Sequence, residues 1–112
     1  MAALTSTSVT LAGVTVAPVA VSASDTIAAT QFGSLGVRLR VINGGGSPDT
    51  VTILDPNLTQ MGSAATNPTV SVVNATTKDI FIPLSSVNAG TGVATVTHSF
   101  TTTVTCELTR VP

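Results

Sequence analysis

Short runs of alternating hydrophobic and polar residues fill most of this chain, and such alternation is typical of β-strands that bury one face. One run places Val37, Leu39 and Val41 on the same face. Arg38 and Arg40 alternate with them and fall on the opposite face. Gly, Pro, Asn and Asp separate the runs, and no stretch has the spacing of an amphipathic helix. We therefore predict an all-β chain that folds as a single-domain antiparallel β-sandwich, for which a jelly roll is one candidate topology.

The order of the runs predicts particular strands and loops. The strand 37–41 is followed by the flexible segment Asn43–Asp49 and then by the strand Thr50–Ile53, so we expect these two strands to pair as a hairpin. The segment Asp55–Pro68 has no regular pattern and is predicted to be a loop that contacts a partner. The remaining elements are predicted to be strands 69–73 and 78–82, a turn at 88–92, and strands 92–99 and 102–110. The inward face of the last strand is predicted to carry Thr102, Val104, Cys106 and Leu108.

The beginning of the chain differs from the rest because residues 1–24 contain no charged side chain. They contain β-forming Val and Thr, and an unpaired strand of this kind is prone to aggregation unless something covers it. We therefore predict that residues 1–24 form an extended N-terminal arm, or edge strands, that pair with another subunit, followed by the sandwich domain over residues 25–112. Removing the arm is expected to leave a folded sandwich that no longer docks. The candidate interface residues are Leu4, Val9, Leu11, Val14, Val16, Arg38 and Arg40.

Composition indicates a thin core and a surface with little charge. Hydrophobic residues make up 43% of the 112 residues, but they are mostly Val and Ala, with three Phe and no Trp or Tyr. Small side chains each remove little apolar area from water, so we expect docking or oligomerisation to supply part of the stability. Charged residues make up 8%, against roughly a quarter in an ordinary soluble domain.

Charge and hydropathy also argue against two classes of partner. The net charge is −1, and four cations provide no basic stripe for a phosphate backbone. The apolar stretch 11–23 follows no basic residue and is interrupted by Thr15 and Pro18, so we expect neither an export signal nor a membrane span. The expectation is therefore no nucleic-acid partner and no membrane partner.

Candidate catalytic and metal-binding residues are few, because the chain has one His and one Cys. His98 alternates with hydrophobic residues and is predicted to be structural, and Cys106 is predicted to be a buried small hydrophobe. The alternative, in which His98 activates Cys106 as a nucleophile, requires the two side chains to be adjacent. The acids are scattered singly, and Asp49 and Asp55 are expected to make hydrogen bonds in turns. We predict that the protein is not an enzyme, with no catalytic, cofactor-binding or metal-binding residue and no cofactor.

Several segments after Asp25 together carry a recognisable pattern of strands and turns. They are Leu39–Pro48, Thr50–Ile53, Val70–Val72, Lys78–Pro83, Gly92–Thr97 and Thr103–Val111. In these segments the chain resembles a family of small phage virion proteins, common near major capsid genes in phages of actinobacteria. The pattern contains no catalytic signature. Members of this family are taken to be capsid decoration (cement) proteins or minor virion components, and decoration proteins often sit as trimers on the outer face of a capsid.

The resemblance implies a structural virion protein. The expected function is capsid decoration, in which the protein binds the outer face of a phage capsid and bridges major capsid subunits. The expected partners are the major capsid protein and further copies of this chain in a homotrimer, on the outer surface of a virion assembled in the host cytoplasm. A tail, head-tail connector or head-fibre component is an alternative. A receptor- or carbohydrate-binding module is a second alternative, although the chain has no Trp or Tyr on which a sugar could stack.

Overall fold

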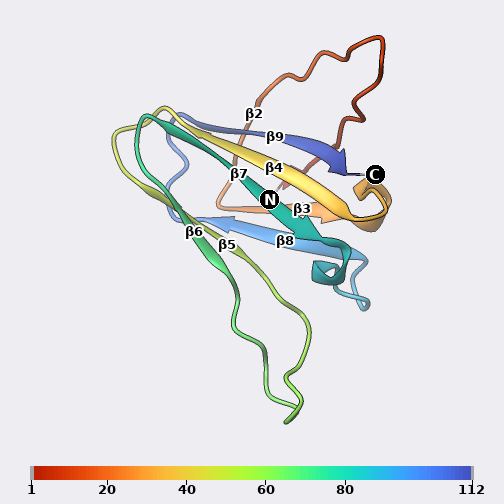
Figure 1. Cartoon of the computed structure of the whole chain (residues 1–112). Coiled ribbons are helices and arrows are strands. Elements are labelled where there is room, and N and C mark those ends of the chain that lie inside the picture. Colours follow the sequence, from red (N-terminus) through yellow and green to blue (C-terminus); the bar gives the residue numbers. More distant parts are fainter. Residues whose placement is uncertain (1, 112) are drawn as a thin grey trace.

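β-Strands dominate the computed structural model, which describes residues 2–111 (Figure 1). The strands are β1 (Ala2–Ala3), β2 (Val19–Ala20), β3 (Ser24–Ala28), β4 (Gly36–Asn43), β5 (Asp49–Ile53), β6 (Thr69–Val72), β7 (Thr76–Pro83), β8 (Val93–His98) and β9 (Val104–Val111). Two 3-10 turns, η1 (Ala29–Gln31) and η2 (Leu84–Ser86), are the helices of this part of the chain. Neither is long and apolar enough to cross a membrane. The predicted all-β class is confirmed.

The strands form two sheets around one hydrophobic core. Sheet A has the order β1-β3-β8-β5-β6 and sheet B the order β2-β9-β4-β7. The pairs are nested along the chain, because β2 pairs with β9, β3 with β8, β4 with β7 and β5 with β6, all antiparallel. A nested hairpin rolled into two facing four-stranded sheets is the jelly-roll arrangement. The short β1 extends sheet A by a parallel pairing with β3. The predicted antiparallel β-sandwich is therefore confirmed.

Side chains that alternate along the strands fill the space between the sheets. Val37, Leu39 and Val41 of β4 are fully buried, as the alternation predicts. On β9 the predicted inward residues from Val104 to Leu108 are also buried, but Thr102 is exposed in the turn before the strand. The strand begins only after Thr103, whose φ of 59° is incompatible with extended backbone. The remaining core is mostly Val and Ile, together with Leu4, Phe32, Ala94, Cys106 and Leu108.

The predicted hairpin of strands 37–41 and 50–53 is wrong, because β4 lies in sheet B and β5 in sheet A. The intervening segment carries the chain from one sheet to the other. Asn43 holds this crossing, since its Nδ2 donates to the carbonyl oxygens of Ser47 (2.8 Å) and Val72 (3.0 Å). The N–H of Gly45 donates to Asn43 Oδ1 at 3.0 Å. A buried amide thus satisfies backbone groups that a hairpin ladder would otherwise satisfy.

The N-terminal segment is partly built into the sandwich. Leu4 is 6% exposed and Val21 8% exposed, and both belong to the core. The N–H of Leu4 donates to the carbonyl oxygen of Thr26 at 2.8 Å, which continues the pairing of β1 with β3. Deleting everything before Asp25 would therefore remove two core side chains and strand β2. We therefore do not expect the sandwich to fold normally without residues 1–24. A substitution in the exposed loop is the better test of docking.

Candidate functional site

An eleven-residue excursion, residues 8–18, projects from the β9 edge of sheet B and is called the N-terminal loop below (Figure 1). Both of its ends are fixed on β9. Before the loop, Thr7 bridges to Thr109, and after the loop β2 pairs with Thr105 and Cys106. The loop itself is therefore a defined projection between two anchor points on one strand.

A tight turn forms the tip of the N-terminal loop. The N–H of Gly13 donates to the carbonyl oxygen of Thr10 at 3.0 Å, and the hydroxyl of Thr10 donates to the carbonyl oxygen of Gly13 at 3.2 Å. Gly13 has a φ of 83°, which glycine adopts at no steric cost. The turn leaves the side chain of Leu11 fully exposed, and Val9 and Val14 of the same loop are also exposed. The tip thus presents a small apolar surface to solvent.

A second projection, the β5–β6 loop of residues 54–68, repeats this construction (Figure 1). The N–H of Gly62 donates to the carbonyl oxygen of Thr59 at 2.9 Å, and Gly62 has a φ of 85°. Met61, which precedes this glycine, is 91% exposed, and Leu58 is also exposed. Both loops therefore end in a Thr-x-x-Gly turn that holds a large apolar side chain in solvent.

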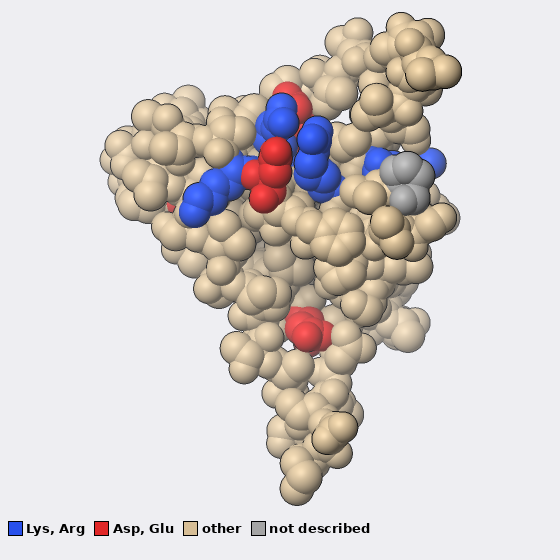
Figure 2. Space-filling view, viewed as in Figure 1, with Lys and Arg blue, Asp and Glu red and all other residues tan. Residues whose placement is uncertain are grey.

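Neither tip carries charge, and this distinguishes the two loops from the body of the protein. The sequence has no charged residue before Asp25 and none between Asp55 and Lys78. In Figure 2 both projections are free of charge beyond their bases, while Lys, Arg, Asp and Glu gather in a band across the sandwich. Both projections therefore present exposed apolar side chains on a locally uncharged surface.

The band of charge lies on the outer face of sheet B and is centred on Arg40. In the strand register Arg40 stands between Asp79 of β7 and Glu107 of β9. Its Nε lies 2.8 Å from Asp79 Oδ1, and its Nη1 lies 4.0 Å from Glu107 Oε2. The hydrogen bond between Arg40 and Asp79 lowers the pKa of Asp79 and raises the pKa of Arg40. Arg40 is therefore already paired within its own chain.

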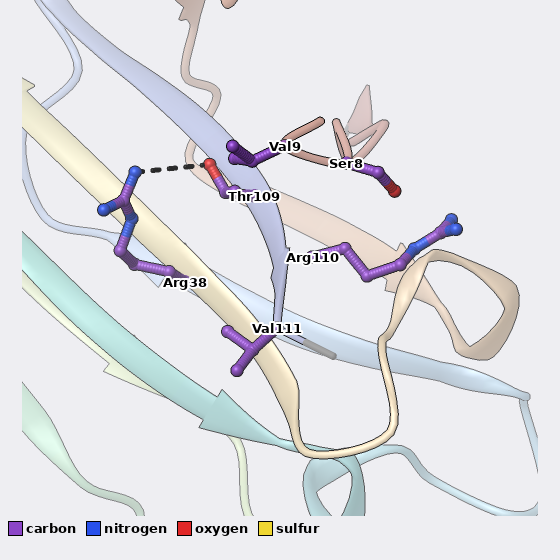
Figure 3. A pocket seen from close by; sticks show the side chains of 6 residues that line it. All are labelled: Ser8, Val9, Arg38, Thr109, Arg110 and Val111. Carbon is purple, nitrogen blue, oxygen red and sulfur yellow. Dashed lines mark hydrogen bonds between the residues drawn. The ribbon is translucent and has the colours of Figure 1, made fainter. Parts of the chain in front are cut away.

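Arg38 lies closer to the N-terminal loop (Figure 3). Its Nη2 donates to Thr109 Oγ1 at 3.4 Å, and its buried Nε has no hydrogen-bond partner among residues 2–111. A groove of about 360 Å³ separates Arg38 from Val9 and is also lined by Val111. The structure thus brings Arg38 of β4 together with the base of the projecting loop, which the sequence pattern alone did not reveal.

The predicted interface residues fall into three groups. Val9, Leu11 and Val14 are exposed on the N-terminal loop, whereas Val16 is half-buried against the base of that loop. Arg38 and Arg40 lie on the outer face of sheet B. Leu4 was wrongly predicted to be an interface residue, because it is buried in the core of its own chain. The exposed residues that the interface prediction missed are Leu58 and Met61, although their loop was predicted to contact a partner.

A group of ionisable side chains also lies inside the sandwich. His98 Nδ1 is 2.6 Å from Asp49 Oδ2, and His98 Nε2 is 3.8 Å from Asp25 Oδ2. Asp49 Oδ1 accepts hydrogen bonds from the N–H groups of Ser99 (3.0 Å) and Phe100 (3.2 Å). The prediction that His98 is structural agrees with these contacts, and the prediction that Asp49 caps a turn is too narrow. All three ionisable side chains are almost completely buried, so they fix strands rather than meet a substrate.

Metal binding and thiol chemistry receive no support from the described residues. No group of three or more His, Cys, Asp and Glu side chains within residues 2–111 is arranged to hold a metal ion. Cys106 lies on β9 of sheet B, and burial, together with the negative charges of Asp25 and Glu107, raises the pKa of its thiol to about 11. A thiol with such a pKa stays protonated at neutral pH and is a poor nucleophile.

Comparisons with models of protein families, with curated proteins and with solved structures gave no match to this chain. The interpretation of function therefore depends on the residues and geometry described above.

Proposed function

We propose that this chain is a structural virion protein, a capsid decoration protein that binds the outer face of a phage capsid and bridges major capsid subunits. The observation that carries the proposal is the pair of loops that project from the jelly roll and end in uncharged tips with exposed Leu11 and Met61. A rigid sandwich with two apolar tips is suited to bind two protein surfaces at once.

Each apolar tip is small, so a single tip should bind weakly, and docking is expected to need many copies on a repeated lattice. Burying one Leu or Met side chain contributes about 1.5–3 kcal/mol, which alone gives weak binding. Repetition of the contact over the capsid lattice adds avidity, because linked sites bind at a high effective concentration. Because the tips are uncharged, we expect the association rate to depend little on salt concentration.

The fold is compatible with the proposal but does not select it, since jelly rolls occur in viral capsid proteins and in lectins alike. Two further observations favour the virion. The segments of strand and turn pattern after Asp25 resemble small phage virion proteins, and the chain offers no Trp or Tyr for stacking against a sugar.

We assign the capsid contact to the β5–β6 loop. This loop projects from the sandwich, and its apolar residues Leu58 and Met61 have no role in the core. Substituting Met61→Asp is expected to abolish binding to the capsid, because the carboxylate would have to be buried without a partner. Leu35→Asp is a matched control, since Leu35 is an exposed apolar residue outside both loops.

The test is binding of the purified protein to mature phage capsids that lack it, followed by imaging. Saturable binding at regular positions on the shell, with a higher melting temperature of the capsid, would support decoration. It should be lost with Met61→Asp and kept with Leu35→Asp. Failure of the unsubstituted protein to bind capsids would overturn decoration in favour of a tail or connector component.

A further inference from the structure

One edge of the sandwich is left open on the side opposite the N-terminal loop. Strand β7 is the outermost strand of sheet B and pairs only with β4, whereas the loop projects from β9 and β2 at the other edge. A long unpaired edge strand is a liability that folded proteins usually cover or blunt. Lys78 and Asp79 blunt the first half of β7 and Pro83 blunts its last residue, but Ile80–Ile82 between them carry no charge.

A groove runs beside β7, where this edge of sheet B faces β5 and β6 of sheet A. It encloses about 310 Å³ and is lined mainly by apolar residues. Its apolar lining includes Ile53, Val70, Ile80, Phe81 and Pro83, and we call it the β7 groove. A cavity of about 150 Å³ lined by aliphatic side chains already admits benzene, so a branched aliphatic side chain fits the β7 groove.

The β7 groove contains an exposed aromatic side chain. Phe81 is 55% exposed on a strand whose alternate residues, Ile80 and Ile82, are buried. Its aromatic ring is therefore available to a second protein. Asp55 is the one charged residue among those that line the groove, so an uncharged apolar group is the occupant that suits it best.

The N-terminal loop supplies such a group, but only from another molecule. Its tip carries the fully exposed Leu11, and the loop contains no charge. Because the loop and the groove lie at opposite edges of sheet B, the loop projects away from the groove of its own chain. We propose that copies of this protein associate head to tail, with Leu11 of one copy bound in the β7 groove of the next.

This contact goes beyond docking on a capsid and does not depend on it. A head-to-tail contact is heterologous, so it produces a closed ring or an open chain rather than a two-fold symmetric dimer. It also covers the uncharged second half of β7 and the fully exposed Leu11 in one step. An acidic partner or a membrane fits less well, because the loop has no Lys or Arg and no aromatic residue.

The experiment measures the mass of the full chain by sedimentation over a range of concentrations. The unsubstituted protein is expected to form species larger than a dimer as the concentration rises. Leu11→Asp and Phe81→Lys should each give monomers, while Met61→Asp should associate normally. Circular dichroism checks that the exposed substitutions leave the fold intact.

Combining Leu11→Asp with Phe81→Lys tests the pairing itself, because the new carboxylate and ammonium would meet across the contact. Recovery of association in the double variant, relative to either single variant, would identify Leu11 and Phe81 as partners. A monomeric unsubstituted protein, normal association of Leu11→Asp, or no recovery in the double variant would overturn the proposal. None of these measurements uses capsids, so they are independent of the test of decoration.

Discussion

Each sheet of the sandwich has a nitrogen-bearing side chain on an internal strand, with carboxylates on both neighbouring strands. In sheet A, His98 of β8 lies between Asp25 of β3 and Asp49 of β5. In sheet B, Arg40 of β4 lies between Asp79 of β7 and Glu107 of β9. Each has one short and one long contact, at 2.6 and 3.8 Å in sheet A and at 2.8 and 4.0 Å in sheet B.

The two groups differ in the face of the sheet they occupy. The group around His98 faces the core and is almost completely buried, while Arg40 and Asp79 are roughly 40% exposed. A buried polar group that loses its partner bears the full cost of desolvation. An exposed pair competes with water and salt ions, so its removal changes stability little. The same geometry should therefore be structural in sheet A and nearly neutral in sheet B.

The largest effect is expected from Asp49→Ala. The substitution leaves His98 Nδ1 and the N–H of Phe100 without their acceptor, and leaves the N–H of Ser99 with the carbonyl oxygen of Thr50 at 3.2 Å. We expect the free energy of unfolding to fall by about 3 kcal/mol or more, as measured by urea unfolding. Asp55→Ala, in an exposed loop, should cost less than about 1 kcal/mol. Equal costs for the two variants would contradict the structural role of the buried group.

A smaller loss is expected from His98→Leu. Leu fills much of the same space, and Asp49 keeps the two backbone N–H groups that bind its Oδ1. Asp25 keeps the N–H and hydroxyl of Ser22, whereas the buried Asp49 Oδ2 loses its contact with His98. The cost should therefore be that of one unsatisfied buried acceptor, about 1–3 kcal/mol in the same urea assay. A loss as large as that of Asp49→Ala would show that His98, rather than the backbone contacts, dominates the group.

The sequence pattern predicts which side chains point inward but not how the strands assemble. Alternation correctly placed Val37, Leu39 and Val41 in the core, because a side chain's face depends only on its own strand. The pairing of β4 with β7 and β9 was not predicted, since it joins segments far apart in the chain. The nearby strand after the glycine run was a plausible partner, and only the contacts of buried Asn43 reveal the crossing.

The buried ionisable group could have been found in part. Asp25, Asp49 and His98 each occupy an inward position of their strands, next to inward residues such as Ile27, Val51 and Val96. A polar residue at an inward-facing position of a strand indicates that a hydrogen-bond partner is buried beside it. The sequence does not show that the three strands are neighbours. Leu4 gave no such signal, because two-residue β1 is too short to show a period.

On the exposed side, Arg40→Met is expected to raise the pKa of Asp79 back toward its ordinary value of 3.8. The hydrogen bond from Arg40 stabilises the ionised carboxylate, so its contribution to stability is present above the unfolded pKa and is lost as pH falls through the lower folded pKa. Titration of the Asp79 carboxyl carbon by NMR measures the shift, and Lys78→Met is the control. The melting temperature at pH 7 should change little, and an unchanged pKa of Asp79 would contradict the pairing.

The smallest effect is expected at Cys106, which lies on β9 between the two groups. Burial is the main reason that the pKa of its thiol is raised from 9.0 to about 11, followed by Asp25 of the inner group and Glu107 of the outer one. Because the folded pKa is the higher one, this contribution to stability is complete below the unfolded pKa and is lost as pH rises from about 9 to about 11. Glu107→Gln removes only the weakest of the three causes.

The thiolate absorbs in the ultraviolet, and the chain has no Trp or Tyr whose absorption would obscure it. An alkaline titration of Glu107→Gln should therefore show a thiol pKa only slightly below that of the unsubstituted protein and still above 9.0. A fall to 9.0 would mean that the exposed group controls Cys106. Since Glu107 lies on the solvent side of β9 and the thiol faces the core, water should screen most of its influence.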